Sequence, residues 1–487
     1  MHSGELTPDF SPGPILDALS EYQGSIVDLD QSLTVDAGSL HRSIDYLRWQ
    51  LSAAGLSGGD RVVVAVANGP RFIAILAAVL RRGGTPLLVH FKTPPAELQR
   101  LAHRWGAQFI ISDSHQASDL QPVTRRARTY SDDGWVRLAF AWVDTDHADF
   151  QDSYPTLPGV PLHPTSGTTG QPKIAVRPGP CAVAEARHYI DTTGIAADDT
   201  ILAVPPMSHA YAYGMCVMVP LLSGANIVTT RQFNAASVMR AMTGGGVTVF
   251  PAVPAMLDML LITGGCLQKP PRYVFSAGAP LAARTAAAFE RKCGVRVRPL
   301  YGTTETGGIT IAISDTRELT PGCVGETLVD VSACVREAAA PLGTLHVNSA
   351  SMMAGYLAPG GIDNTSIDNG WFDTGDLATI DEVGAIHLKG RQTEMINVAG
   401  MKVVPSEVEE ILAAMPGVRE TKVYAGRLGS GDQFVKAAIV ANGVTDPSRF
   451  RAHCEQNLVY YKRPSRYVFV ESLPKTPSGK IILDRLP

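Results

Sequence analysis

Continuous apolar runs alternate with amphipathic stretches in the first part of the chain. The run at residues 60–68, DRVVVAVAN, is rich in β-branched residues, which is typical of a strand buried on both faces of a parallel sheet. Residues 70–84 follow with a helical pattern that ends in Arg81, Arg82 and Gly83, residues that mark a helix C-terminus. Strand-like runs at 85–90 and 108–113 flank another helical stretch at 95–106. Strands separated by such helices predict βαβ units and a parallel sheet.

The same alternation returns after residue 199. Its apolar runs and helical patterns are at residues 199–206, 225–230, 237–246, 247–252, 272–280, 284–294 and 295–302. From about Thr320 the pattern changes to short strands with Gly and Asn turns. A last segment after Arg391 contains a helical pattern at 405–415, in which Ser406 and Glu409 are spaced as a capping box. We therefore expect two related parallel-sheet lobes and a separate, small C-terminal domain.

Composition narrows the class of protein. A chain of 487 residues with 45% hydrophobic and 18% charged residues is expected to be soluble, globular and divided into more than one domain. The net charge of −4 gives no electrostatic reason to expect nucleic acid or an anionic membrane as a partner. The seven cysteines never form a C-x-x-C pair, and no signal peptide or long apolar run is evident. We therefore expect reduced thiols and a cytoplasmic location.

A loop after residue 163 has the composition of a phosphate-binding loop. Small hydroxyl residues and glycines leave backbone N–H groups uncovered, and a nearby lysine adds positive charge. The residues concerned are Thr165, Ser166, Gly167, Thr168, Thr169, Gly170 and Lys173. The loop differs from a Walker A loop, because Pro172 precedes the lysine and Ile174 follows it. Taken alone, the stretch is equally compatible with a flexible surface loop.

Five further stretches carry polar residues that a core would not require. Tyr301 and Glu305 follow a predicted strand, at the end where open α/β sheets bind ligands. Glu305 is suited to a magnesium ion that bridges phosphates, and Tyr301 to stacking on a flat base. The other stretches contain His209, Asp373 with Asp376, Arg391 and Lys480. Each of these residues is commonly a structural or surface residue, so none of them is decisive alone.

Their order along the chain is distinctive. The Ser/Thr/Gly loop is followed by Pro…His, YGTTE, TGD, GR and finally PSGK. In this order the motifs resemble those of the adenylate-forming (ANL) superfamily of acyl- and aryl-CoA synthetases, peptide-synthetase adenylation domains and luciferases. The resemblance extends from about residue 25 to the end. It implies an α/β fold whose N-terminal domain, residues 1–390, has two related sheet–helix lobes plus a small β-barrel-like part. A hinge at 391–393 and a small, mobile α+β C-terminal domain at 394–487 are implied as well.

The resemblance also implies roles for the matching residues. The loop from Thr165 to Lys173 is expected to hold the β- and γ-phosphates of ATP. Tyr301, followed by Gly302, is expected to stack on adenine opposite Ser276, Gly278, Ala279 and Pro280. Asp376 is expected to bind the ribose hydroxyls with help from Arg391, while Thr304 contacts the α-phosphate and Glu305 the Mg²⁺ ion. Catalytic roles are implied for His209, near the acid's carboxylate, and Lys480, between carboxylate and α-phosphate. Gly400 matches the glycine of the pantetheine tunnel.

Three positions depart from the family pattern. Thr393 stands at the hinge where Asp or Lys is usual, and Pro299 with Leu300 precedes the predicted adenine site without a side-chain amide. Amino-acid-activating members have an aspartate after a phenylalanine, whereas this chain has Asn234 after Phe233. An amide cannot neutralise a buried ammonium, so an α-amino acid is not expected as substrate. The expected substrate pocket comprises Tyr211, Tyr213, Asn234, Val253, Met256, Ser276, Ala277 and Thr306.

The expected function follows from these motifs. The chain is expected to activate a small-molecule carboxylic acid, of a bulky aromatic or alicyclic kind, with ATP and Mg²⁺, and to transfer the acyl group to coenzyme A. The alternative acceptor is the phosphopantetheine of a carrier protein, and the basic residues Lys462, Arg463 and Arg466 suit either one. A luciferase-like monooxygenase remains an alternative that an oxygen-uptake assay would detect. A catalytically inactive relative is not expected, because Lys173, Glu305 and Lys480 are all present.

Overall fold

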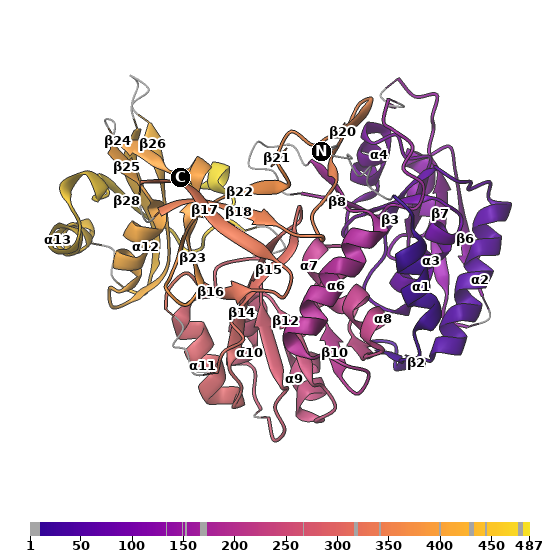
Figure 1. The fold of residues 1–487 in the computed structure, drawn as a ribbon, viewed down its shortest axis with the longest axis horizontal. Helices are drawn as coiled ribbons and strands as arrows, with labels where there is room; N and C mark the ends of the chain where they lie inside the picture. Colours follow the sequence, from indigo (N-terminus) through magenta and orange to yellow (C-terminus); the bar gives the residue numbers. More distant parts are fainter. Residues whose placement is uncertain are drawn as a thin grey trace, which may run out of the picture.

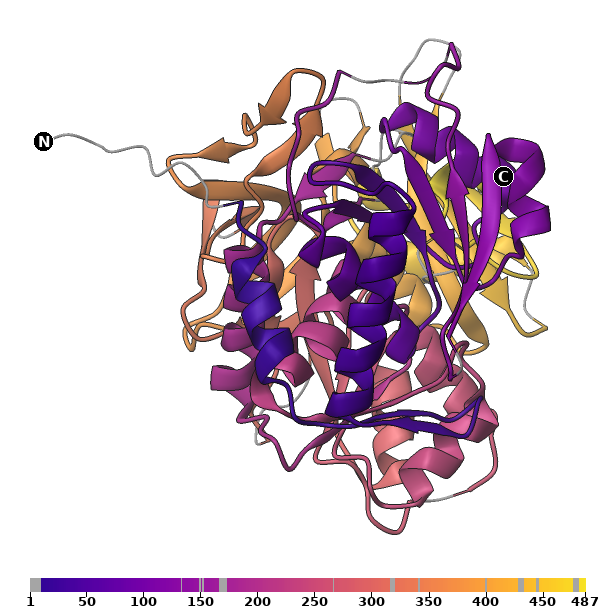
Figure 2. The same cartoon turned by 90° about the vertical axis from the view of Figure 1, so that its right-hand side faces the viewer.

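The computed structural model describes residues 10–132, 134–148, 150, 153–165, 173–265, 267–315, 320–339, 342–398, 401–427, 433–443, 446–475 and 481–487. Two large sheets with their helices form the body of the molecule, and the C-terminal elements lie to one side of it (Figure 1). After a turn of 90° that brings the right-hand side of Figure 1 forward, the indigo N-terminal helices lie in front and the yellow C-terminal elements lie behind the body (Figure 2).

Within the described residues, the first sheet contains nine strands and builds the first lobe. In spatial order its strands are β20 (Gly361–Asp363), β19 (Gly355–Ala358), β9 (Ile174–Val176), β8 (Leu162–Pro164), β4 (Thr85–Leu88), β3 (Arg61–Ala65), β5 (Phe109–Ser112), β7 (Arg137–Trp142) and β6 (Arg126–Ser131). Strands β8, β4, β3 and β5 are parallel; the apolar runs predicted β3, β4 and β5, and β8 was not predicted. The crossover helices are α3 (Pro70–Arg81) and α4 (Pro95–Arg104).

The second sheet has fourteen strands in the part of the chain that the structure describes. Its parallel part consists of β1 (Ile26–Asp28), β11 (Asn226–Thr229), β10 (Thr200–Ala203), β12 (Val249–Ala252), β13 (Tyr273–Ser276) and β14 (Val297–Thr303), with antiparallel β2 (Leu33–Val35) at the edge. The sheet continues antiparallel through β15 (Gly307–Ile311), β16 (Cys323–Thr327), β23 (Ile386–Arg391), β22 (Trp371–Ile380), β18 (Leu342–Asn348) and β17 (Ser332–Ala339), and β21 (Ile367–Asp368) pairs with β22. Of the strands between residues 320 and 391, β16, β17, β18, β21, β22 and β23 therefore extend the second lobe's sheet, whereas β19 and β20 join the first.

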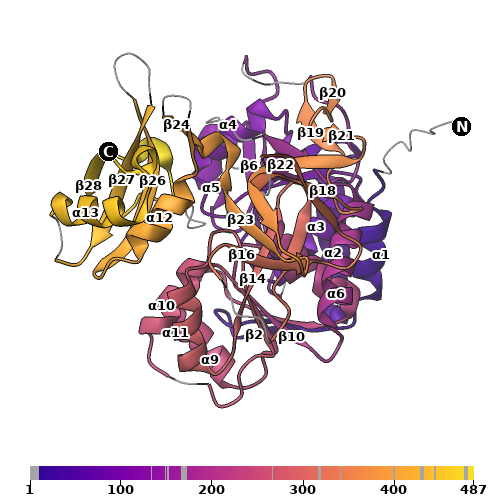
Figure 3. The same cartoon turned by 60° about the vertical axis from the view of Figure 1, so that its left-hand side comes forward.

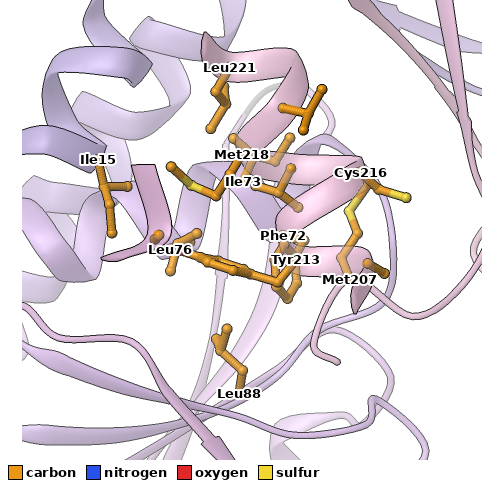
Figure 4. Close-up of a cluster of buried hydrophobic side chains, with 14 of the residues drawn as sticks. Ile15, Phe72, Ile73, Leu76, Leu88, Met207, Tyr213, Cys216, Met218 and Leu221 are labelled. Atoms are coloured by element: carbon orange, nitrogen blue, oxygen red, sulfur yellow. The ribbon is translucent and has the colours of Figure 1, made fainter. Parts of the chain in front are cut away.

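The two lobes share one hydrophobic core. Helix α3 is buried along almost its whole length, which explains why its sequence is apolar on nearly every side. Phe72, Ile73 and Leu76 of α3 lie beside Tyr213 and Met218 of the second lobe (Figure 4). The surrounding helices are α1 (Gly13–Glu21), α2 (Ala37–Ala53), α6 (Gly179–Thr193), α7 (Ala210–Ala212), a π-helical turn at Tyr213–Met218 and α8 (Val219–Ser223). Helices α9 (Ala235–Thr243), α10 (Pro254–Ile262) and α11 (Ala283–Cys293) enclose a further cluster against the second sheet. Short α5 spans Ala117–Leu120.

The C-terminal elements form their own clusters of buried residues, all of them after residue 395. They comprise β24 (Ile396–Val398), β25 (Met401–Val403), α12 (Pro405–Ala413), β26 (Val418–Arg427), β27 (Gln433–Ala441), α13 (Pro447–Asn457) and β28 (Arg466–Phe469), and they protrude from the body in Figure 3. The Arg284 guanidinium donates to the carbonyl of Val418 at 3.1 Å, and the Ser406 hydroxyl donates to the carbonyl of Lys389. The exact hinge at 391–393 remains a prediction.

The prediction of a capping box at the start of α12 is wrong. The N-cap position is Val404, without a side-chain cap, and Pro405 begins the helix. The Ser406 hydroxyl binds Lys389 instead, while the Glu409 carboxylate accepts a hydrogen bond from the backbone N–H of Val423 at 2.8 Å. Both side chains therefore bind partners distant in sequence, where a local pattern predicted a local pair.

None of the helices within the described residues is long and apolar enough to cross a membrane.

Candidate active site

The predicted site residues follow the carboxyl ends of adjacent parallel strands. Strands β10, β12, β13 and β14 are neighbours in the second sheet and run in the same direction. His209 and Tyr211 follow β10, Val253 follows β12, Ser276 ends β13, and Tyr301 lies near the end of β14. Since the carboxyl ends of parallel strands meet at one edge of a sheet, these segments lie along one edge, where open α/β sheets bind ligands.

The turn between β14 and β15 carries Thr304 and Glu305. Its conformation is held by a side chain on either side: the Thr306 backbone N–H donates to the Thr303 hydroxyl at 3.2 Å, and the two hydroxyls lie 3.1 Å apart. Thr306 is fully buried, so it supports the turn rather than presenting its side chain to solvent. The carbonyl of Glu305 accepts from the Met353 N–H at 2.7 Å. The backbone that presents Thr304 and Glu305 is therefore fixed from both sides.

Tyr301, Asp376 and Arg391 form one contiguous group. The Tyr301 hydroxyl donates to Oδ2 of Asp376 at 2.6 Å, and Nε of Arg391 lies 2.7 Å from Oδ1. Asp376 and Arg391 face one another across the β22–β23 ladder, which sets this pairing. Burial, followed by the nearby Asp376 carboxylate, raises the pKa of Tyr301, so its phenol stays a neutral donor. The predicted adenine and ribose residues are thus brought together, with Gly302 exposed beside them.

Lys173 and Glu305 are joined through a tyrosine that the sequence analysis missed. The Nζ atom of Lys173 lies 4.5 Å from the centre of the Tyr356 ring, and the Tyr356 hydroxyl donates to Oε1 of Glu305 at 2.8 Å. Tyr356 lies on β19, which pairs with β9 directly after Lys173. The only hint in the sequence that Tyr356 belongs to the site is its place next to Gly355 in a short apolar stretch. The strand with which it pairs is distant in the sequence, so the contact could not be predicted.

The loop between Thr165 and Lys173 is closed at its base, where the Thr165 N–H donates to the Lys173 carbonyl at 2.8 Å. This bond continues the β8–β9 hairpin and brings the two ends of the predicted phosphate loop together. The loop residues between them, and two further predicted site residues, lie outside the described residues: Ser166, Gly167, Thr168, Thr169, Gly170, Gly400 and Lys480.

His209 lies beside a second histidine, from the other lobe. Its ring centre is 6.3 Å from that of His90, which follows β4 of the first sheet. Desolvation, and secondarily the nearby His90, lowers the pKa of His209 to about 4. Desolvation also lowers the pKa of His90. Both imidazoles are therefore neutral at pH 7 and can accept or donate one hydrogen bond each. His90 was missed, although its position directly after a buried strand was a usable signal.

Glu305 fits a magnesium ion that is bound mainly through the phosphates of a nucleotide. Among the described residues, no group of three or more His, Cys, Asp or Glu side chains could hold a metal ion. Mg²⁺ usually binds through one or two carboxylates together with substrate phosphates and water, so Glu305 beside the closed loop suits it.

The residues predicted for the acid pocket fall into separate environments. Ser276 and Ala277 are buried at the end of β13, and Gly278, with φ +83°, turns the chain towards exposed Pro280 through Ala279. Val253 and Met256, at the start of α10, are partly exposed, as is Tyr211. Tyr213 is 1% exposed and packs in the shared core (Figure 4). Tyr213, which was expected to line the substrate pocket, is therefore a residue of the hydrophobic core.

Asn234 requires a correction. It is the N-cap of α9, where its side-chain oxygen accepts from the Ser237 N–H at 3.0 Å. The residue is exposed, and its helix follows β11, which is separated from β14 by β10, β12 and β13. A helix cap explains an asparagine here without any substrate. We therefore remove Asn234 from the proposed pocket, and its identity no longer argues against an α-amino acid.

Replacing Asn234 by aspartate is expected to leave acid activation within about twofold of the unchanged protein. Aspartate caps a helix as well as asparagine does, so α9 keeps its first turn. Asn234→Ala removes the cap and is expected to lower the free energy of unfolding by about 1 kcal/mol. Pyrophosphate exchange and urea unfolding measure the two effects. A large, selective change of acid preference in Asn234→Asp would return this residue to the pocket.

Comparisons with known proteins bear on the family of this chain. A family model described as "AMP-binding enzyme" matches residues 25–357, and one described as "AMP-binding enzyme C-terminal domain" matches residues 407–480. A long-chain-fatty-acid–CoA ligase of Mycobacterium tuberculosis is 26% identical, with 89% of this chain and 88% of the relative covered. A 2-succinylbenzoate–CoA ligase of Bacillus cereus is also 26% identical, with 91% of each chain covered.

A solved structure has the same fold over the whole length. O-succinylbenzoate coenzyme A synthetase (MenE) from Bacillus subtilis, in complex with AMP, superposes with a TM-score of 0.81. The alignment covers 98% of each chain at 21% sequence identity, so this likeness concerns the fold.

Proposed function

We propose that this chain, which belongs to the AMP-binding enzyme family, activates a carboxylic acid with ATP and then transfers the acyl group to the thiol of coenzyme A. One observation carries the proposal: two contact groups, Lys173–Tyr356–Glu305 and Tyr301–Asp376–Arg391, meet on the same hairpin at a ligand-binding sheet edge. The first group suits the phosphates and metal of ATP, and the second suits its nucleoside.

The first half-reaction joins two anions. A carboxylate oxygen of the acid attacks the α-phosphorus, the bond from that phosphorus to the bridging oxygen breaks, and pyrophosphate leaves. Lys173 and the loop before it neutralise the β- and γ-phosphates, and Thr304 binds the α-phosphate. Glu305 would hold Mg²⁺, which supplies further neutralisation of phosphate charge when bound. Lys480 spans the carboxylate and the α-phosphate as charge develops between them.

The second half-reaction forms the thioester. The thiol sulfur, after losing its proton, attacks the acyl carbon, and AMP leaves with the electron pair of the broken carbon–oxygen bond. His209, neutral because its pKa is lowered by desolvation, sits where it can accept or donate a hydrogen bond beside the carbonyl. In this proposal the C-terminal domain rotates about residues 391–393 between the two steps, and Gly400 lines the path of the thiol.

We further propose a bulky aromatic or alicyclic acid as substrate. The candidates that remain after the corrections are mostly apolar or aromatic, as in pockets that enclose such ligands: Tyr211, Val253, Met256, Ser276 and Ala277. One relative is named for a long-chain fatty acid and another for 2-succinylbenzoate, so the family accepts acids of different shapes.

Coenzyme A is preferred to a carrier protein as acceptor. Two relatives are named as CoA ligases, and this supports coenzyme A. The basic residues that suited either acceptor favour neither one, because Lys462 forms an ion pair with Glu407 at 2.5 Å and the Arg463 guanidinium donates to the carbonyls of Leu458 and Glu455. Their charges are thus engaged within the C-terminal domain. We also propose a cytoplasmic location, supported by five cysteines that are free thiols within the described residues: Cys181, Cys216, Cys323, Cys334 and Cys454.

Pyrophosphate exchange across a panel of carboxylic acids tests the function directly. We expect acid-dependent exchange of labelled pyrophosphate into ATP with an aromatic or alicyclic acid, followed by acyl-CoA release when coenzyme A is added. Turnover with a holo-carrier protein alone would make the carrier the acceptor. The proposed adenylation is refuted if no acid in a panel that includes fatty and amino acids supports exchange.

A further inference from the structure

A short segment connects the turn that bears Glu305 to the strand that follows Lys173. The Met353 N–H donates to the Glu305 carbonyl at 2.7 Å, and the Ala354 N–H donates to the Val176 carbonyl at 2.9 Å. Immediately afterwards β19 pairs with β9, and Tyr356 stands opposite Ala175. The segment therefore links the two sheets at the point where the proposed phosphate residues meet.

Tyr356, at the end of this segment, touches both functional side chains. Lys173 precedes Ala175 by two positions, so it is the diagonal cross-strand neighbour of Tyr356, within reach of an aromatic ring. The hydroxyl at the other end of the ring donates to Oε1 of Glu305 at 2.8 Å. One rigid side chain thus sets the separation between a cation and a carboxylate that belong to different sheets.

We propose that Tyr356 is a positioning residue for the nucleotide's metal and phosphates, holding Glu305 through its hydroxyl and Lys173 through its ring. This inference rests on the proposed function. It assigns to Tyr356 no contact with the reacting atoms.

The chemistry of each contact suits this role. A hydrogen bond to one carboxylate oxygen fixes the plane of the carboxylate, and within the described residues no hydrogen bond occupies Oε2 of Glu305. A ring holds an ammonium without neutralising its charge, whereas a carboxylate partner would compete with phosphate.

Packing alone is the competing explanation. Tyr356 also packs against the small cluster of buried residues formed by Ala175, Met353 and Phe372. Replacing a residue that only packs would lower the stability of the protein, or would change ATP affinity equally with and without Mg²⁺. A positioning residue for the metal would instead change the part of ATP affinity that depends on Mg²⁺.

The test is calorimetric ATP binding with Mg²⁺ and, separately, with EDTA. In Tyr356→Phe the ring remains, so affinity in EDTA is expected to stay unchanged while the gain from Mg²⁺ shrinks about tenfold, the typical effect of losing a hydrogen bond to a charged group. In Tyr356→Leu, which also loses the contact with Lys173, affinity in EDTA is expected to fall about threefold as well. Thermal unfolding verifies that each variant is folded.

Tyr424 provides a matched control in the C-terminal domain. Its hydroxyl also donates to an oxygen, the carbonyl of Pro487, and Lys436 lies 5.3 Å from its ring centre. Tyr424→Phe is expected to change neither affinity. In a Glu305→Gln background, Tyr356→Phe is expected to add no further loss, because the carboxylate on which it acts is gone.

The outcomes separate the two levels of inference. If ATP binding to the unchanged protein gains nothing from Mg²⁺, the proposed function fails and this inference fails with it. If that gain is present and Tyr356→Phe retains all of it, the positioning role alone is overturned. A loss of equal size with Mg²⁺ and with EDTA would likewise overturn it, in favour of packing.

Discussion

Lys480→Ala will reduce pyrophosphate exchange about 10²- to 10³-fold and leave thioester formation from pre-made acyl-adenylate almost unchanged. Losing one group that stabilises developing charge typically costs this much in rate. We propose, from the resemblance to adenylate-forming enzymes, that Lys480 acts between the carboxylate and the α-phosphate, so that its charge matters only while these two anions are joined. Once the mixed anhydride exists, the transition state no longer contains the charge that this lysine offsets.

Lys475 serves as the matched control for this experiment. It lies five positions earlier, and its ammonium forms a partly exposed ion pair with Glu420 at 2.5 Å. Lys475→Ala is expected to change neither half-reaction. If Lys480→Ala lowered both half-reactions to the same extent, the residue would be supporting the structure of the C-terminal domain. No change in either would leave Lys480 an ordinary surface lysine.

Glu185→Gln will lower the free energy of unfolding by about 3 to 5 kcal/mol, the usual cost of breaking a buried ion pair by removing one charge. Oε2 of Glu185 lies 2.7 Å from Nη2 of Arg177, and each side chain is only 1% exposed. Oε1 accepts from the Gly308 N–H at 3.1 Å. The variant leaves the Arg177 charge buried without its counter-charge, and this dominates the effect.

The same carboxylate supports the hairpin that carries Glu305. Gly307 has φ +72°, and a Cβ atom there would lie 2.7 Å from the Glu185 carboxyl carbon, so the chain passes directly against this side chain. We therefore expect Glu185→Gln to raise the Mg²⁺ concentration required for ATP binding as well. Urea unfolding measures the stability, and ATP calorimetry measures the second effect.

Glu420→Gln is the control for Glu185→Gln. Its ion pair with Lys475 is exposed by about a third on each side, and such pairs contribute about 0 to 1 kcal/mol. Equal losses of stability in Glu185→Gln and Glu420→Gln would contradict the role given to the buried pair. A loss below about 1 kcal/mol for Glu185→Gln would show that the surrounding polar groups stabilise Arg177 without it.

The sequence alone determined the layered α/β organisation. The runs at 60–68 and 85–90 became the buried parallel strands β3 and β4, and the apolar helix between them became α3 in the shared core. These patterns are reliable because they record burial, which each segment must satisfy along its whole length. The order of the short motifs identified the family because each motif carries its chemistry in residues that are adjacent in the sequence. The domain boundary at 391–393 and the site roles remain predictions.

Only the tertiary structure decided which side chains meet. Ser406 and Glu409 have the spacing of a capping box yet bind Lys389 and Val423, and Asn234 caps a helix where a substrate contact was expected. Tyr356 gained its proposed role because β19 pairs with β9, about 180 residues earlier in the chain. A side chain's partner depends on strand pairing and register across the whole fold, and a hydrogen bond forms wherever its donor and acceptor are brought together. The spacing of residues within one segment cannot predict which partner a side chain binds, because other possible partners belong to segments distant in the sequence.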